Sequence, residues 1–197
     1  MQIALILTLT RIVLSPIFIV LYLFHEPWGV SLQWLPFILL FILGISELTD
    51  LLDGYLARKL NQVTELGKVL DPMADSITRL SIFFAFTKGI VGLPIVLVLV
   101  FFYRDSFIST LRTVCALRGV ALSARVSGKI KAVIQGLTML VILVAMVFYA
   151  FEWITLIDFQ RLSFYTVLIA ALYTLASGVE YLWAHRNIIN KAWLGKL

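Results

Sequence analysis

The chain has 197 residues, of which 61% are hydrophobic, and it carries a formal net charge of +5 and a single cysteine. This hydrophobic fraction is well above that of a soluble globular protein, so the sequence predicts an integral membrane protein with one domain, residues 1–197. One cysteine excludes an internal disulfide and a cysteine-rich metal site. In a membrane protein the basic excess indicates orientation and contact with anionic head groups, and we expect no nucleic-acid partner.

Apolar segments along the chain are long enough to predict six transmembrane helices in a compact all-α bundle. Their expected ranges are residues 4–24, 31–59, 67–88, 94–118, 127–150 and 162–184. The first helix is expected to be retained, because it lacks the basic start and the small-residue cleavage site of a signal peptide. Near its start, Arg11 is either a membrane-surface anchor or a contact to a phosphate or cytidine group.

Four aspartates lie where the second helix ends and the third begins. Asp50 and Asp53 are spaced i,i+3, and Asp71 and Asp75 are spaced i,i+4, so each pair projects from one helix face. Because only a short polar link joins the two helices, both pairs are expected to meet at one membrane face. Carboxylates beside lipid-spanning sequence are costly and therefore indicate a functional site.

The aspartates make an oxygen-rich site, which favours Mg²⁺, Mn²⁺ or Ca²⁺ over zinc or copper. They would repel one another without cations, and two divalent ions would spare one aspartate to act as a base. Gly54 and Ala57 fall one turn after Asp50 and Asp53, so a bulky group such as a nucleotide diphosphate can approach that face. Two alternatives stay open: the aspartates only solvate a helix end, or they line the cation pathway of a small transporter.

The stretch reads D-L-L-D-G-Y-L-A-R from Asp50 and G-K-V-L-D-P-M-A-D from Gly67, and it resembles the signature of the CDP-alcohol phosphatidyltransferases. The resemblance implies two ions, Mg²⁺ or Mn²⁺, and a homodimer. The implied metal ligands are Asp50, Asp53, Asp71 and Asp75, and Asp75 is also implied to deprotonate the acceptor hydroxyl. The residues implied to contact the CDP moiety are Thr8, Asp50, Asp53, Gly54, Ala57, Arg58 and Gly67.

Basic residues gather in the fourth and fifth predicted helices. On the fourth, Asp105, Ser109 and Arg112 share one face, where they form either an internal salt bridge or an anion site. On the fifth, Lys129 and Lys131 lie in the first turn, where cations oppose the helix dipole. A bound anion would relieve this, and snorkelling to lipid head groups is the alternative.

The runs R-D-S-F-I-S-T-L-R from Arg104 and G-K-I-K from Gly128 are similar to those of the bacterial phosphatidylglycerophosphate synthases. This resemblance implies transfer of a phosphatidyl group from CDP-diacylglycerol to sn-glycerol 3-phosphate, with release of CMP. The residues implied to hold the acceptor phosphate are Arg104, Arg112, Lys129 and Lys131. Inositol phosphate and, less favoured, serine are the alternative acceptors, because serine would leave the cationic cluster without an anion.

With six spans, one side of the membrane holds Arg58 and Lys59, the basic segment 118–131 and the C-terminal tail, whereas the opposite loops, 25–30, 88–93 and 151–161, carry few basic residues. The positive-inside rule places the basic side in the cytoplasm, together with both termini. The four aspartates lie on the same side. The sequence therefore predicts a multi-pass protein of the bacterial inner membrane, with its active site facing the cytoplasm.

Overall fold

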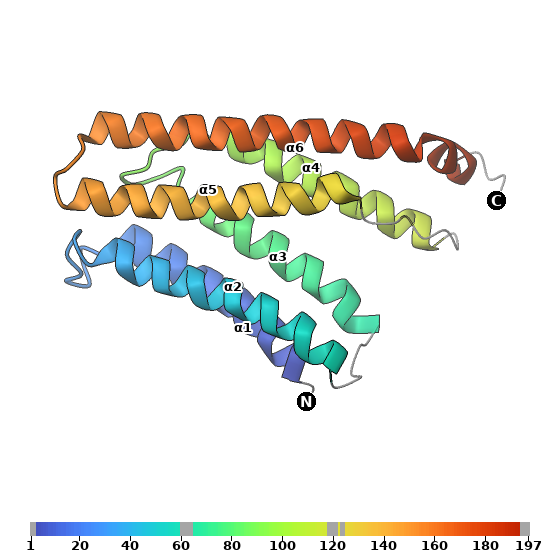
Figure 1. Ribbon diagram of the computed structural model, residues 1–197, viewed down its shortest axis with the longest axis horizontal. Helices are drawn as coiled ribbons and strands as arrows, with labels where there is room; N and C mark the ends of the chain where they lie inside the picture. The colour runs from blue at the N-terminus through green and yellow to red at the C-terminus, as the bar shows by residue number, and fades with distance from the viewer. Residues whose placement is uncertain (1–2, 60–64, 118–121, 123–124, 194–197) are drawn as a thin grey trace. The chain divides into compact units, whose positions relative to one another are not determined.

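The protein is described by a computed structural model that covers residues 3–59, 65–117, 122 and 125–193 (Figure 1). Every regular element in this part of the chain is a helix. The helices are α1 (Ile3–Phe24), α2 (Leu35–Lys59), α3 (Glu65–Ala85), α4 (Ile95–Leu117), α5 (Val126–Ala150) and α6 (Leu156–Trp193). The prediction of an all-α fold is thereby confirmed.

Three of the helices are long and apolar enough to cross a membrane. The candidate spans are Ile6–Phe24 in α1, Val126–Ala150, which is all of α5, and Leu156–Arg186 in α6. Their length and composition support an integral membrane protein. The other predicted spans, α2, α3 and α4, carry several charged residues each. A total of six membrane-spanning helices therefore stays a prediction.

Both ends of α6 lie beyond the range predicted from the sequence, which placed a turn up to Arg161 and ended the helix at residue 184, whereas α6 runs from Leu156 to Trp193. Thr155 instead caps the helix: the Asp158 N–H donates to Thr155 Oγ1 at 3.2 Å, and that hydroxyl donates to Asp158 Oδ2 at 2.7 Å. The first of these bonds satisfies a backbone donor that a helix start otherwise leaves unpaired, and the second holds the Thr155 hydroxyl in place. The predicted turn was wrong here because the pattern T-L-I-D before an apolar run is itself a helix-start signal.

The chain divides into two compact units. The first contains Met1–Leu93 and Met139–Ser163, and the second contains Pro94–Thr138 and Phe164–Leu197. The first unit therefore holds α1, α2 and α3 with the aspartate motif, whereas the second holds α4 with the basic cluster. Because α5 and α6 each contribute to both units, the prediction of one domain is neither confirmed nor contradicted.

In the first unit, α1 packs against α2 and α3 (Figure 1). The buried Phe86 ring meets Phe18 and Tyr22 edge-on, with centroids 6.0 and 5.5 Å apart. Each such pair contributes about 0.5–1.5 kcal/mol beyond the burial of area. The Tyr22 hydroxyl donates to the Lys88 carbonyl at 2.8 Å and accepts from the Val91 N–H at 3.1 Å. These contacts fix the register of α1 against α3.

Replacing Gly89 is expected to strain this junction. Gly89 has φ +65, and a Cβ built there would lie 3.0 Å from the Tyr22 hydroxyl oxygen, which its two hydrogen bonds hold in place. Gly89→Ala is therefore expected to lower the free energy of unfolding by about 1–2 kcal/mol. The measurement is the melting temperature of the purified protein in detergent.

Gly44→Ala is the matched control for Gly89→Ala. Gly44 lies inside α2, and no atom would come within 4 Å of its added Cβ. Because alanine is the better helix former, its melting temperature should equal or slightly exceed that of the wild type. Equal losses from the two substitutions would contradict the local strain at Gly89.

In the second unit, α4 packs against α6 through a small apolar cluster. Ile108, Leu111 and Cys115 of α4 are buried there together with Leu122 and Tyr181. A buried cysteine in such surroundings behaves as a small apolar residue. This packing sets the neighbouring turn of α4, which carries Arg104 and Asp105, close to α6.

Candidate active site

A buried polar stripe on α1 faces α3. Thr8, Arg11 and Ser15 follow one another at helical spacing and are all at least 97% buried, being 1%, 2% and 3% exposed. Thr8 Oγ1 donates to Asp71 Oδ1 at 2.8 Å, and Thr78 Oγ1 donates to the Arg11 carbonyl at 3.4 Å. The stripe therefore brings α1 against the second aspartate pair of the motif.

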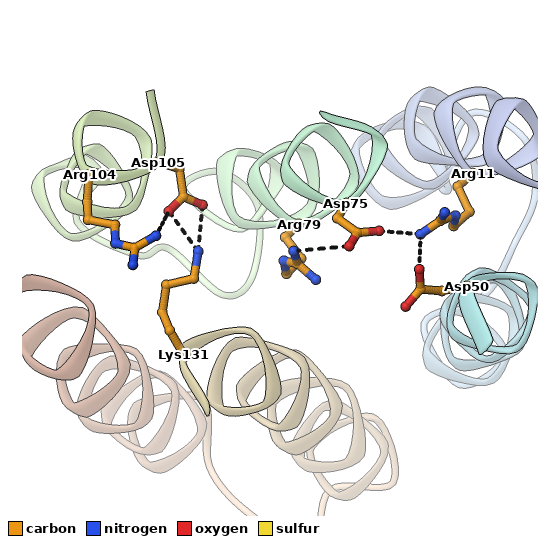
Figure 2. A network of polar contacts seen from close by, with 7 residues as sticks. All are labelled: Arg11, Asp50, Asp75, Arg79, Arg104, Asp105 and Lys131. Atoms are coloured by element: carbon orange, nitrogen blue, oxygen red, sulfur yellow. Dashed lines mark hydrogen bonds and ion pairs between the residues drawn. The ribbon is translucent and has the colours of Figure 1, made fainter. Parts of the chain in front are cut away.

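Arg11 joins the two aspartate pairs. Figure 2 shows that its Nη1 atom contacts both Asp50 Oδ1 and Asp75 Oδ1. Its side chain is 2% exposed, so the guanidinium, which does not lose its proton in proteins, needs anions beside it. On the other side of Asp75, Oδ2 lies 3.7 Å from Arg79 Nη2. Both oxygens of Asp75 therefore face a cation.

These side chains surround a small cavity. Its lining residues are Arg11, Ser46, Glu47, Asp50, Asp75, Thr78 and Arg79. Its volume of about 10 Å³ is enough for roughly one water molecule. Ser46 and Thr78 were not singled out from the sequence, although each lies one helical turn from a motif aspartate, which is the signal that could have found them.

The structure brings part of the predicted motif together. Asp50 and Asp75 meet at Arg11, while Asp71 lies against Thr8. Other predicted site residues have a helical backbone, but their side chains lie outside the described part of the structure: Asp53, Gly54, Ala57, Arg58 and Gly67. Among the side chains that are described, no three His, Cys, Asp or Glu gather closely enough to hold an ion. The four-aspartate metal site therefore stays a prediction.

The chemistry of the cavity nevertheless fits a hard divalent cation. One atom, Arg11 Nη1, contacts a carboxylate oxygen from α2 and another from α3, so a single cation in its place would have a ligand from each helix. The other anionic and neutral donors of the lining, on Glu47, Ser46 and Thr78, are oxygens as well. Oxygen donors are those that Mg²⁺ and Mn²⁺ prefer, so the residues present suit the metals implied by the sequence.

The second unit contains a buried ion cluster. Lys131 Nζ donates to both Asp105 oxygens at 2.7 and 2.8 Å, and Arg104 Nη1 donates to Asp105 Oδ1 at 3.1 Å (Figure 2). Arg104 Nε is buried and has no hydrogen-bond partner within the described residues. Of the residues predicted to hold the acceptor phosphate, Arg104 and Lys131 thus gather at Asp105, whereas Arg112 and Lys129 are exposed.

Two residues of α6 make contacts in the second unit that the sequence pattern did not reveal: Gly178 lies against Arg104 of the cluster, and Glu180 pairs with Arg125. A Cβ at Gly178 would lie 3.2 Å from Arg104 Cγ, so the glycine lets α6 approach that side chain closely. Glu180 Oε1 lies 2.6 Å from Arg125 Nε, just before α5 begins. An acid far from either end of a long apolar helix is the signal that could have drawn attention to Glu180.

A comparison with protein families matches residues 1–159 to the model described as CDP-alcohol phosphatidyltransferase. The chain belongs to the CDP-alcohol phosphatidyltransferase family. The matched residues include all of α1 to α5, and with them the aspartate motif and the ion cluster around Asp105. As a CDP-alcohol phosphatidyltransferase, the protein is an enzyme of the transferase class and acts in phospholipid biosynthesis.

Several curated CDP-alcohol phosphatidyltransferases align with most of the chain. A protein of Bacillus subtilis (strain 168) is 34% identical over 186 residues, which cover 89% of this chain and 90% of its own length. A protein of Escherichia coli (strain K12) is 32% identical over 186 residues, covering 91% of this chain and 92% of its own. A third, of Salmonella typhimurium (strain LT2), is 32% identical over 187 residues, covering 92% and 93%. All three are named CDP-diacylglycerol–glycerol-3-phosphate 3-phosphatidyltransferase.

Proposed function

We propose that this enzyme transfers the phosphatidyl group of CDP-diacylglycerol to sn-glycerol 3-phosphate and forms phosphatidylglycerol phosphate and CMP. The names of its relatives support this reaction. The observation that carries it is the convergence of Asp50 and Asp75, from two different helices, on a single cation-binding position. Transfer between phosphate esters depends mainly on placing positive charge and a base around the reacting phosphorus, and this position offers both.

Asp75 is the proposed base. The acceptor hydroxyl oxygen attacks the phosphorus that carries the diacylglycerol, its proton moves to Asp75, and the bond from that phosphorus to the CMP oxygen breaks. Oδ1 of Asp75 contacts Arg11, whereas Oδ2 lies 3.7 Å from Arg79, which is beyond hydrogen-bond distance. Oδ2 is therefore the oxygen more open to receive the proton.

The proposed ligands of two Mg²⁺ or Mn²⁺ ions are Asp50, Asp53, Asp71 and Asp75. When bound, the ions would neutralise the diphosphate and stabilise the leaving CMP. Thr8 orients Asp71 through its hydroxyl. The proposed contacts to the CDP moiety are Thr8, Asp50, Asp53, Gly54, Ala57, Arg58 and Gly67.

The acceptor phosphate is proposed to bind the cations of the second unit. Arg104 and Lys131 both pair with Asp105, so these three side chains together carry one positive charge in excess. Arg104 Nε adds a buried donor that has no partner among the described residues. A phosphate would neutralise the excess charge and accept a hydrogen bond from Arg104 Nε, with Arg112 and Lys129 completing its site. A neutral or zwitterionic acceptor such as serine would leave the excess charge uncompensated.

We place the enzyme in the bacterial inner membrane, as a homodimer with six spans in each chain and with its active site and termini on the cytoplasmic side. The distribution of basic residues supports this orientation through the positive-inside rule. A cytoplasmic site also suits the proposed water-soluble, phosphorylated acceptor, since both are then on the same side of the membrane.

The test is a panel of acceptors given to the purified protein with CDP-diacylglycerol and Mg²⁺, scored by CMP release. We expect release with sn-glycerol 3-phosphate and none with serine, and we expect EDTA to stop it. Release with inositol phosphate but not with sn-glycerol 3-phosphate would overturn the acceptor. Cation flux in liposomes without nucleotide, together with no CMP release from any acceptor, would instead favour a transporter.

A further inference from the structure

We propose that Arg11 is a built-in counter-cation that competes with a divalent ion for Asp50 and Asp75. For metal to bind both carboxylates, the Arg11 side chain must withdraw from them. This inference rests on the proposed metal-dependent transfer and adds to it a residue of α1 that controls how tightly the site holds its ions.

The competition concerns the same atoms. Arg11 Nη1 contacts Oδ1 of Asp50 and Oδ1 of Asp75, one from α2 and one from α3. A Mg²⁺ ion requires its oxygen ligands at about 2.0–2.1 Å, so it cannot share the space between these two oxygens with a guanidinium nitrogen. Two cations held this close in a buried site would also repel each other strongly.

The cavity supports the same conclusion. Arg11 forms part of its lining, and its volume of about 10 Å³ is roughly that of one water molecule. A divalent ion with its remaining water or phosphate ligands needs several times this space. Withdrawal of the long Arg11 side chain would free both the carboxylate oxygens and the volume.

The backbone of α1 does not need to move for this exchange. Thr78 Oγ1 donates to the Arg11 carbonyl, and Thr8 bonds to Asp71, so the helix is held to α3 by contacts that do not involve the guanidinium. Glu47, the remaining carboxylate of the cavity lining, offers Arg11 another anion. The structure is therefore compatible with a change of side-chain position alone.

The test measures Mn²⁺ binding without substrate, by electron paramagnetic resonance of the free ion, in detergent. Arg11→Gln is expected to bind Mn²⁺ at least about tenfold more tightly than the wild type, since it removes the competing charge. Arg11→Lys keeps that charge and should stay near the wild-type affinity. Arg79→Gln is the matched control, because Arg79 Nη2 lies 3.7 Å from Asp75 Oδ2 and so approaches this carboxylate less closely than Arg11 does. It should tighten binding less than Arg11→Gln.

A second readout uses the wild-type protein and does not depend on the folding of a variant. Phenylglyoxal modifies accessible guanidinium groups, and mass spectrometry locates the modified residue. Arg11, which is 2% exposed, should react slowly in EDTA and severalfold faster with saturating Mn²⁺.

The results of these measurements distinguish a failure of the proposed competition by Arg11 from a failure of the proposed metal-dependent transfer. If Arg11→Gln leaves the affinity for Mn²⁺ unchanged or lowers it, Arg11 does not compete with the ion. The same conclusion follows if the rate at which phenylglyoxal labels Arg11 does not depend on Mn²⁺. If the wild type binds no Mn²⁺ and releases CMP without any metal, the metal-dependent mechanism fails first and the inference fails with it.

Discussion

Asp75→Asn is expected to lower CMP release from CDP-diacylglycerol by roughly 10²–10⁴-fold, the usual contribution of a positioned base. The amide keeps the shape of the carboxylate and can still accept a hydrogen bond from Arg11, but it cannot take up the acceptor proton. The rate is to be measured at saturating donor, acceptor and Mg²⁺, so that a change in affinity for any of them does not hide the effect.

Two controls accompany Asp75→Asn. Glu26→Gln removes an exposed acid from the turn after α1, outside the motif, and should leave the rate unchanged. The melting temperature of Asp75→Asn should fall little, because Asp50 still neutralises Arg11. A variant that keeps wild-type turnover would show that Asp75 is not the base, whatever it does for metal binding.

Asp105→Ala is expected to have the largest effect on stability. It leaves the buried Lys131 and the partly buried Arg104 without their shared carboxylate. Breaking a buried ion pair by removing one partner costs about 3–5 kcal/mol, because the remaining charge stays buried and unpaired. For a chain of this size the melting temperature should fall by roughly 6–20 °C.

A double-mutant cycle identifies the source of that loss. Combining Asp105→Ala with Lys131→Met removes one of the two stranded charges, so the double variant should lose less stability than the sum of the single losses. Additive losses would show that the two side chains do not interact. An unchanged melting temperature of Asp105→Ala would contradict the burial of the cluster.

That Asp50 and Asp75, one aspartate of each pair, come together was predictable, because helical spacing fixes which residues share a face and a short link makes the two helices neighbours. Asp50 and Asp75 indeed lie at one position. The cation between them was not predictable. Whether Arg11 faces lipid or the aspartates depends on the register of α1 against α3, and this is set by the packing of Tyr22 on Phe86, far along the chain.

The basic cluster shows the same limit. Spacing along α4 left open a salt bridge between Asp105 and Arg112, since the two share a helix face, with an anion site as the alternative. The structure pairs Asp105 with its neighbour Arg104 and with Lys131 from α5, and the contact with α5 could not be read from spacing along α4. The start of α6, by contrast, could have been predicted. The pairing of Thr155 with Asp158 that caps the helix is local, and its pattern is visible in the sequence.

The length of α6 has a consequence for its C-terminal turns. Its 38 residues extend about 57 Å at 1.5 Å per residue, whereas the hydrocarbon core of a bilayer is about 30 Å thick. Near the end of the candidate span, the Arg186 guanidinium lies 4.6 Å from the centre of the exposed Trp183 ring, a pairing suited to the head-group level. A reporter domain fused after α6 would consequently lie outside the lipid. Its fluorescence or its accessibility to protease would then show on which side of the membrane α6 ends.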